Sequence, residues 1–149
     1  MNIRYNINTA TADDLTIHLR ACDANFIPAL SEKVDIEDYA QKLSKHAVNF
    51  EAWDGGVLAG LIAAYFNDTE NGLGYITNVS TVGGYGGRGI ASTLLQKCIA
   101  YGQAQQFESI GLEVNKQSLA AISLYQKFGF VTVGETDTML KMNLSPLNP

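Results

Sequence analysis

Residues 72–106, GLGYITNVSTVGGYGGRGIASTLLQKCIAYGQAQQ, decide the fold of this chain. The β-favouring residues within 75–82 predict a strand that is buried on both faces. Five of the seven residues that follow are glycine, and Arg88 is the one charged residue among them. From Ile90 onward, apolar residues recur at helical spacing. The stretch therefore predicts a strand, a glycine loop and a long helix in direct succession.

The glycine loop, residues 83–89, has the composition of an anion site. It lacks the side chains that would keep a ligand away from its backbone, and the helix behind it adds free N–H groups and the positive end of a dipole. Phosphate is the anion that such a loop most naturally binds. The alternative is an ordinary tight turn, but one or two glycines would be enough for that.

Two known phosphate-loop patterns can be compared with this loop. A Walker A loop ends in Gly-Lys-Ser/Thr, whereas residues 89–91 read Gly-Ile-Ala. The dinucleotide pattern G-x-G-x-x-G does match residues 84–89. That fold, however, carries its loop after the first strand and an acidic residue at the end of the next, where residues 114–115 here read Val-Asn. We interpret the match as accidental and keep a dinucleotide-binding oxidoreductase as the least favoured alternative.

The remainder of the chain alternates between strand and helix patterns. Further strands are predicted at 3–7, 48–52, 57–66, 110–114 and twice within 130–143, and further helices at 11–22, 35–47 and 119–128. The resulting order is one strand, two helices, three antiparallel strands, then helix, strand, helix and two strands, which indicates a mixed α/β fold. With 149 residues and no internal linker, residues 1–149 are predicted to form one domain.

Composition narrows the class of protein further. A net charge of −5 and a pI near 4.8, without a basic stripe, argue against nucleic-acid binding. No apolar run reaches the length of a bilayer span, and the N-terminus lacks the basic start and apolar core of a signal peptide, so we expect a cytoplasmic protein with no membrane partner. Cys22 and Cys98 lack the spacing of metal ligands, so no metal is expected.

Two blocks of residues resemble one known family. Residues 87–91 read GRGIA and are followed by Leu94 and Leu95, and residues 118–130 read SLAAISLYQKFGF. Together and in this order they resemble the GNAT N-acetyltransferase superfamily. Its signatures are Arg/Gln-x-x-Gly-x-Gly/Ala before the helix and Asn-x-x-Ala-x-x-Leu-Tyr-x-x-x-Gly-Phe in the later block. Gly86 stands at the first position of the loop signature, and Ser118 stands in place of the asparagine.

The resemblance implies both a fold and a cosubstrate. The expected fold is mixed α/β, with a mostly antiparallel sheet flanked by helices and a central parallel pair that splays at its C-terminal ends. The pantetheine arm of acetyl-coenzyme A would lie in that gap, and the backbone N–H groups of the glycine loop would hold its pyrophosphate. The residues expected to bind the cosubstrate are Val79, Thr81, Gly86, Gly87, Arg88, Gly89, Ile90, Ala91, Ser92 and Ser118.

Tyr125 stands where the family's tyrosine acid stands, so the resemblance assigns to it the proton that the departing thiolate needs. A tyrosine that only packs in the core is the alternative. The expected reaction is acetyl transfer to a primary amine. A non-catalytic module that binds acyl-coenzyme A is the competing function, favoured by Gly86, Ser118 and the lack of a visible base. A homodimer also stays open.

The sequence does not reveal the general base. Residues 74–88 contain no carboxylate and no histidine. A water ordered by Asn78, Ser80 and Tyr75 could carry the proton away, or Glu51 could act from the neighbouring strand. The two histidines, His18 and His46, are expected at a helix surface or a helix end.

The acceptor site would be walled, in this family, by the segment between the first two helices, residues 23–35. Its apolar residues within 26–30 suit a compact, partly apolar molecule, and Asp23 could attract an ammonium group. Overall acidity favours a cationic amine over a phosphorylated or carboxylate-rich one. Simple packing of the two helices is the alternative. We expect a small primary amine as acceptor, bound by Asp23, Phe26 and Asn78, with a protein N-terminus or lysine less favoured.

Overall fold

The computed structural model describes residues 2–148, and the strand predicted at the centre of the chain is β4, Leu73–Thr81. Six more strands join it in one sheet: β1 Ile3–Ile7, β2 Val48–Asp54, β3 Val57–Asp68, β5 Ser109–Asn115, β6 Val131–Glu135 and β7 Met139–Leu144. Their order is β1-β2-β3-β4-β5-β7-β6. All neighbours are antiparallel except β4 and β5, which run parallel. The predicted mixed α/β fold is confirmed.

Four helices flank the sheet: α1 Ala12–Cys22, α2 Ile36–His46, α3 Ile90–Ala104 and α4 Leu119–Lys127. Two begin at side-chain caps that the sequence carries. Thr11 Oγ1 accepts the N–H of Asp14 at the start of α1, and Asp35 Oδ1 accepts the N–H of Asp38 at the start of α2. Between α1 and α2 lie two short 3₁₀ turns, η1 Asp23–Asn25 and η2 Leu30–Glu32.

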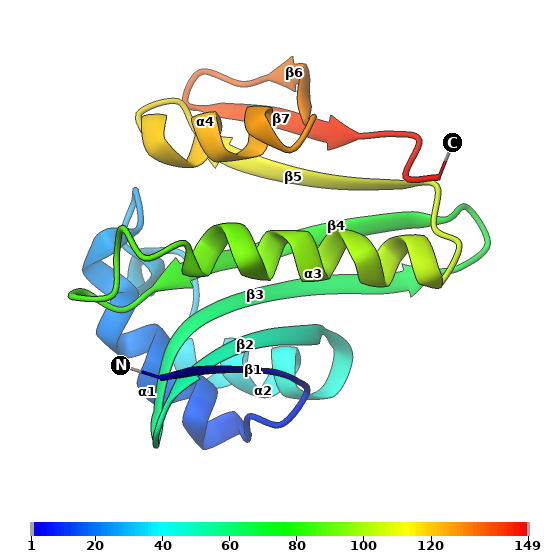
Figure 1. Ribbon diagram of the computed structural model, residues 1–149. Coiled ribbons are helices and arrows are strands. Elements are labelled where there is room, and N and C mark those ends of the chain that lie inside the picture. Colours follow the sequence, from blue (N-terminus) through cyan, green and yellow to red (C-terminus); the bar gives the residue numbers. More distant parts are fainter. Residues whose placement is uncertain (1, 149) are drawn as a thin grey trace.

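The two faces of the sheet carry separate apolar cores, which follow the alternation of the strands. On one face α3 and α4 pack over Phe50, Ile62 and Ile76, and Figure 1 shows α3 lying along the strands. On the other face α1 and α2 pack over side chains that include Trp53 and Leu61. The sheet is thus a layer between two pairs of helices, which hold the strand ends in place.

The parallel pair separates part of the way along the sheet. Residues Leu73 to Ile76 of β4 pair with Ser109 to Leu112 of β5, and no pair follows, although both strands continue. At the same point the register of β4 against β3 shifts: Ala63 pairs with Asn78 and Ala64 with Ile76, so Thr77 is an extra residue. Such a bulge bends its strand. The expected splay is confirmed, and β4 and β5 diverge visibly in Figure 1.

One expectation about the helices is wrong. His18 is not a surface or helix-end residue but is buried in α1, with 2% of its surface exposed. His46 does lie exposed in the last turn of α2. Across residues 2–148, none of the helices combines the length and the apolar character that a membrane span requires. In the same part of the chain no three His, Cys, Asp or Glu side chains gather where a metal ion could bind.

Candidate active site

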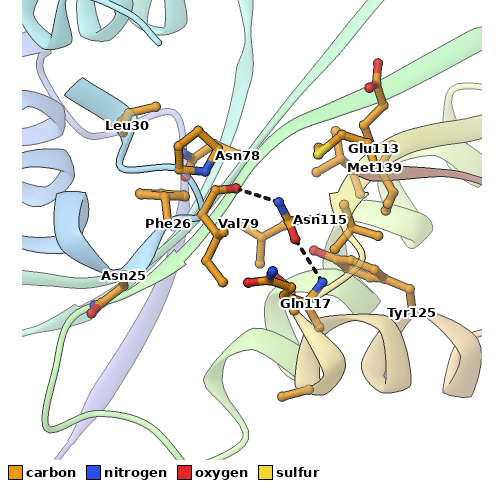
Figure 2. A pocket seen from close by; sticks show the side chains of 18 of the residues that line it. Asn25, Phe26, Leu30, Asn78, Val79, Glu113, Asn115, Gln117, Tyr125 and Met139 are labelled. Carbon is orange, nitrogen blue, oxygen red and sulfur yellow. Dashed lines mark hydrogen bonds between the residues drawn. The ribbon is translucent and has the colours of Figure 1, made fainter. Parts of the chain in front are cut away.

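The divergence of β4 and β5 opens a cavity of about 610 Å³. Its walls come from five parts of the chain: the segment between α1 and α2, the second half of β4, the second half of β5, residues 117–125 at and within α4, and Met139 at the start of β7 (Figure 2). Segments separated by about a hundred residues in the sequence therefore meet here because the strands stop pairing. The polar or titratable side chains in these walls are Asn25, Lys33, Thr77, Asn78, Glu113, Asn115, Gln117, Ser118 and Tyr125.

Tyr125 lies on the inward face of α4 and lines this cavity with 5% of its surface exposed. Its ring packs against Phe130 at a centroid distance of 5.9 Å, which fixes its direction. Within residues 2–148 its hydroxyl has no hydrogen-bond partner. Burial raises the pKa of Tyr125 to about 12, so the phenol keeps its proton at neutral pH. A protonated hydroxyl is therefore available inside the cavity.

Asn78 lines the opposite wall, on β4, and continues into a buried polar chain. Ser80 Oγ donates to Asn78 Oδ1 at 2.8 Å, and the same Oγ lies 2.8 Å from Nε2 of His18. The other ring nitrogen of His18, Nδ1, lies 2.7 Å from the carbonyl oxygen of Leu58. Burial lowers the pKa of His18, and the bond to Leu58 opposes this. The titratable ring of His18 is thus connected to the cavity residue Asn78 through two hydrogen bonds.

The segment between α1 and α2 forms the third wall, through the apolar residues Phe26, Ile27, Pro28 and Leu30. Asp23 does not line the cavity. Its carboxylate instead accepts the backbone N–H of Ser31 at 2.7 Å, and the side chain of Ser31, together with this backbone bond, lowers the pKa of Asp23. Asp23 therefore holds the shape of the segment from outside the cavity.

The glycine loop lies beyond the cavity, where β4 ends and α3 begins. Gly84, Gly87 and Gly89 have positive φ angles of 92°, 75° and 76°, which only glycine adopts without strain. A Cβ added at Gly86 or Gly89 would meet no atom within 4 Å, so the loop backbone is open. The hydrogen-bond ladder of α3 begins at Thr93, which leaves three N–H groups of its first turn unbonded within the helix: those of Ile90, Ala91 and Ser92.

A side chain anchors this loop to the sheet. The hydroxyl of Tyr85 donates to Asp54 Oδ2 at 2.7 Å, at the end of β2. Arg88 is exposed in the loop. The position of the loop after the fourth strand of a largely antiparallel sheet agrees with the interpretation of the G-x-G-x-x-G match as accidental.

The structure brings together five of the predicted site residues and places the others around them. Phe26, Asn78, Val79, Ser118 and Tyr125 line one cavity, whereas Thr81 and the glycine-loop residues lie further along β4 and at the start of α3. Glu51 lies outside the cavity lining, because its buried carboxylate accepts from the N–H groups of Thr9 and Ala10 and from the indole of Trp53. Tyr75 lies in a separate groove at the other end of β4.

Six polar cavity residues were not named as site residues from the sequence: Asn25, Lys33, Thr77, Glu113, Asn115 and Gln117. Lys33 and Glu113 are the only charged side chains in the lining, and Asn115 spans its edge. Alternation along 110–114 does place Glu113 opposite the buried Leu112 and Val114. That position reaches a cavity, however, only because β5 leaves β4 at this point. The combination of a neutral acid, an amide and one charge of each sign can bind a polar molecule and donate a proton to it.

The acetyltransferase (GNAT) family model matches residues 15–130. N-acetylaspartate synthetase of Danio rerio is 29% identical over 119 residues, which cover 78% of this chain and 42% of that protein. The chain thus spans less than half the length of this curated relative.

Solved structures share the fold. N-acetyltransferase from Staphylococcus aureus Mu50 has a TM-score of 0.77 at 19% identity, covering 97% of this chain and 99% of that one. PaiA N-acetyltransferase from Thermoplasma acidophilum, in complex with coenzyme A, has a TM-score of 0.75 at 15% identity, with coverages of 97% and 99%.

Proposed function

Since the chain belongs to the acetyltransferase (GNAT) family, we propose that it transfers an acetyl group from acetyl-coenzyme A to a primary amine of a small molecule. The observation that carries this proposal is the single cavity in which Tyr125 faces the segment between α1 and α2. A proton donor and a wall for a second substrate share one space at the point where the sheet opens. A binding module that performs no chemistry would not need both.

The glycine loop fits the pyrophosphate of acetyl-coenzyme A. Its backbone is open at Gly86 and Gly89, and the first turn of α3 offers the N–H groups of Ile90, Ala91 and Ser92. Arg88 is an exposed cation in the same loop. Val79, Thr81 and Ser118 would bind the pantetheine arm, of which Val79 and Ser118 line the cavity.

The reaction makes one bond and breaks one. The neutral amine nitrogen attacks the acetyl carbonyl carbon, the carbon–sulfur bond breaks, and the sulfur leaves as a thiolate. Tyr125 donates the proton of its hydroxyl to that sulfur, the amine nitrogen releases one proton to solvent as the amide forms, and the phenolate of Tyr125 regains a proton from solvent. Tyr125 still carries its proton at neutral pH, as an acid must when the leaving group departs, although burial makes it a weaker acid than an exposed tyrosine.

The cavity suits an acceptor that is small and partly apolar. Phe26, Pro28 and Leu30 offer apolar surface, and Glu113 can attract an ammonium group before it loses its proton. Lys33 in the same lining favours a second acceptor class, amines that also carry a carboxylate. The name of the Danio rerio relative, N-acetylaspartate synthetase, points to that class as well.

Release of coenzyme A thiol, measured across a panel of amines, tests the proposal. The panel contains butylamine, phenethylamine, L-leucine, L-aspartate and a peptide with a free N-terminus. We expect turnover with at least one small amine, and a lower kcat/KM for Phe26→Ala than for wild type. Tight binding of acetyl-coenzyme A without thiol release from any amine would instead support the non-catalytic module. A preference for the peptide would overturn the small-molecule acceptor.

A further inference from the structure

The buried chain that joins Asn78 to His18 lies outside the acetyl-transfer steps described above. Asn78, Ser80 and His18 are 4%, 8% and 2% exposed, and two distances of 2.8 Å link them. Asn78 alone reaches the cavity (Figure 2). Within this chain, His18 can therefore affect the cavity only through its hydrogen bond to Ser80 and the hydrogen bond of Ser80 to Asn78.

The hydrogens of this chain can be counted. The carbonyl oxygen of Leu58 only accepts, so Nδ1 of His18 must carry a hydrogen. Ser80 has one hydroxyl hydrogen, which must point to Asn78 when the amide turns its Oδ1 toward Ser80. Nε2 of His18 can then bond Ser80 only as a donor. With both ring nitrogens protonated, this arrangement is that of an imidazolium.

A neutral His18 requires a different arrangement of the same atoms. Nε2 then has a lone pair, and Ser80 must turn its hydrogen toward it. Oδ1 of Asn78 would then face the serine oxygen with no hydrogen between them. A flip of the Asn78 side-chain amide, which exchanges Oδ1 and Nδ2, removes this repulsion. Nδ2 then donates to Ser80, and Oδ1 is the atom presented to the cavity.

We propose that His18 is a positioning residue for the acceptor: through Ser80, its protonation state decides whether Asn78 presents an oxygen or an NH₂ group to the cavity. Neutral His18 presents the oxygen, which accepts an N–H of the amine. Protonated His18 presents the NH₂ group, which opposes an ammonium. This inference rests on the proposed function, since it requires an amine acceptor in this cavity.

His18 is the group of this cluster whose pKa burial lowers, whereas burial raises the pKa values of its titratable neighbours. Cys22 on α1, whose Sγ lies 3.7 Å from Nε2 of His18, has a pKa raised to about 11 by burial. Tyr39 on α2, which bonds Thr77 and also interacts with the Asn78 side chain, has a pKa raised to about 12 by burial. No charged side chain in the described chain shifts the pKa of His18. Its titration can therefore be followed without interference from neighbours.

Nuclear magnetic resonance of the free protein tests the first half of the proposal. The chain has two histidines, so a His46→Gln variant assigns the ring signals of His18. We expect a neutral ring with the hydrogen on Nδ1 at about pH 7.5, and side-chain NH₂ signals of Asn78 that shift together with the His18 titration, whose pKa burial holds below the usual value. A hydrogen on Nε2 at that pH, or Asn78 signals that ignore the titration, would overturn the proposal.

Kinetics with phenethylamine test the second half. Below the His18 titration the KM of wild type should rise roughly tenfold relative to that of His18→Gln, since the glutamine accepts from Ser80 at every pH. The affinity for coenzyme A should stay equal in both proteins. Ser80→Ala, which breaks the chain, should raise KM at all pH values and remove the rise in acid. Leu19→Met, an equally buried change on α1, should keep the wild-type profile.

The outcomes separate this inference from the proposed function. If wild type released no thiol with any amine, the proposed acetyl transfer would be contradicted. The nuclear magnetic resonance experiment would still decide the orientation of Asn78. Turnover with the same acid dependence in wild type, His18→Gln and Ser80→Ala would leave the acetyl transfer standing and overturn the role of His18.

Discussion

Asn115 Nδ2 donates to the carbonyl oxygen of Ile27 at 3.3 Å, so one side chain at the end of β5 joins two walls of the cavity. Its Oδ1 accepts the N–H of Gln117 at 2.8 Å, which sets the direction of the amide (Figure 2). Among the described residues it makes the one side-chain hydrogen bond between β5 and the segment between α1 and α2. The acceptor wall is therefore tied to β5 through a single, exposed bond.

Asn115→Asp should loosen that wall without unfolding the protein. The aspartate keeps an oxygen for Gln117 but loses the donor to Ile27, and an exposed hydrogen bond contributes only about 1 kcal/mol. We expect an unchanged melting temperature within a few degrees, a KM for the amine that is several-fold higher, and faster hydrogen exchange in residues 26–33. Asn143→Asp on β7 adds the same charge outside this cavity and serves as the control. Equal KM values for the two variants would exclude a role for this bond.

Tyr125→Phe should lower kcat by roughly 10²-fold, the usual contribution of a positioned acid. The affinity for coenzyme A should not change, because the ring and its packing on Phe130 remain. Stopped-flow or steady-state thiol release gives the rate, and calorimetry gives the affinity. Tyr101→Phe, which removes a hydroxyl elsewhere in the core, should leave kcat intact. If Tyr125→Phe turns over as fast as wild type, another group protonates the thiolate.

Gly89→Ala should weaken binding of acetyl-coenzyme A by about tenfold, whereas Gly86→Ala should change it little. The added methyl group is the same, and it meets no neighbouring atom at either position. Only Gly89 has a positive φ, so the alanine there is strained and shifts the N–H groups of the first turn of α3. Calorimetric titration compares the two. Similar affinities of both variants and wild type would place the pyrophosphate away from this loop.

His18 should make the stability of the protein depend on pH in mild acid. Burial lowers its pKa below the usual 6.5, so between these two values the unfolded chain binds a proton that the folded chain does not. The free energy of unfolding should therefore fall as the pH drops below about 6.5, by at most about 1.4 kcal/mol per pH unit from this group. In urea unfolding experiments at several pH values, the free energy of unfolding of His18→Gln should depend less steeply on pH than that of wild type. A slope as steep as that of wild type would mean that His18 titrates normally in the folded protein.

Local patterns in the sequence predicted the helices, the strands and the glycine loop, because each depends on near neighbours. The burial of His18 was also readable: Leu15, Leu19 and Cys22 mark the apolar face of α1, and position 18 falls on that face. Its partner Ser80 was not, since 62 residues separate them. Glu113 and Asn115 line the cavity because β5 diverges from β4 at this point, which no local pattern reports.

At the point of that divergence β4 carries one inserted residue. Thr77 has no counterpart on β3, and Tyr39 of α2 satisfies the irregular backbone by donating to the carbonyl oxygen of Thr77 at 3.2 Å. The site therefore lies at a β-bulge that is stabilised by Tyr39, a residue outside the sheet. Deleting Thr77 would restore regular pairing of β4 with Ala63 and Ala64 of β3 without moving the register on either side of this point. Such a protein should melt at a higher temperature than wild type and bind no coenzyme A, so that here a more regular strand is a less functional one.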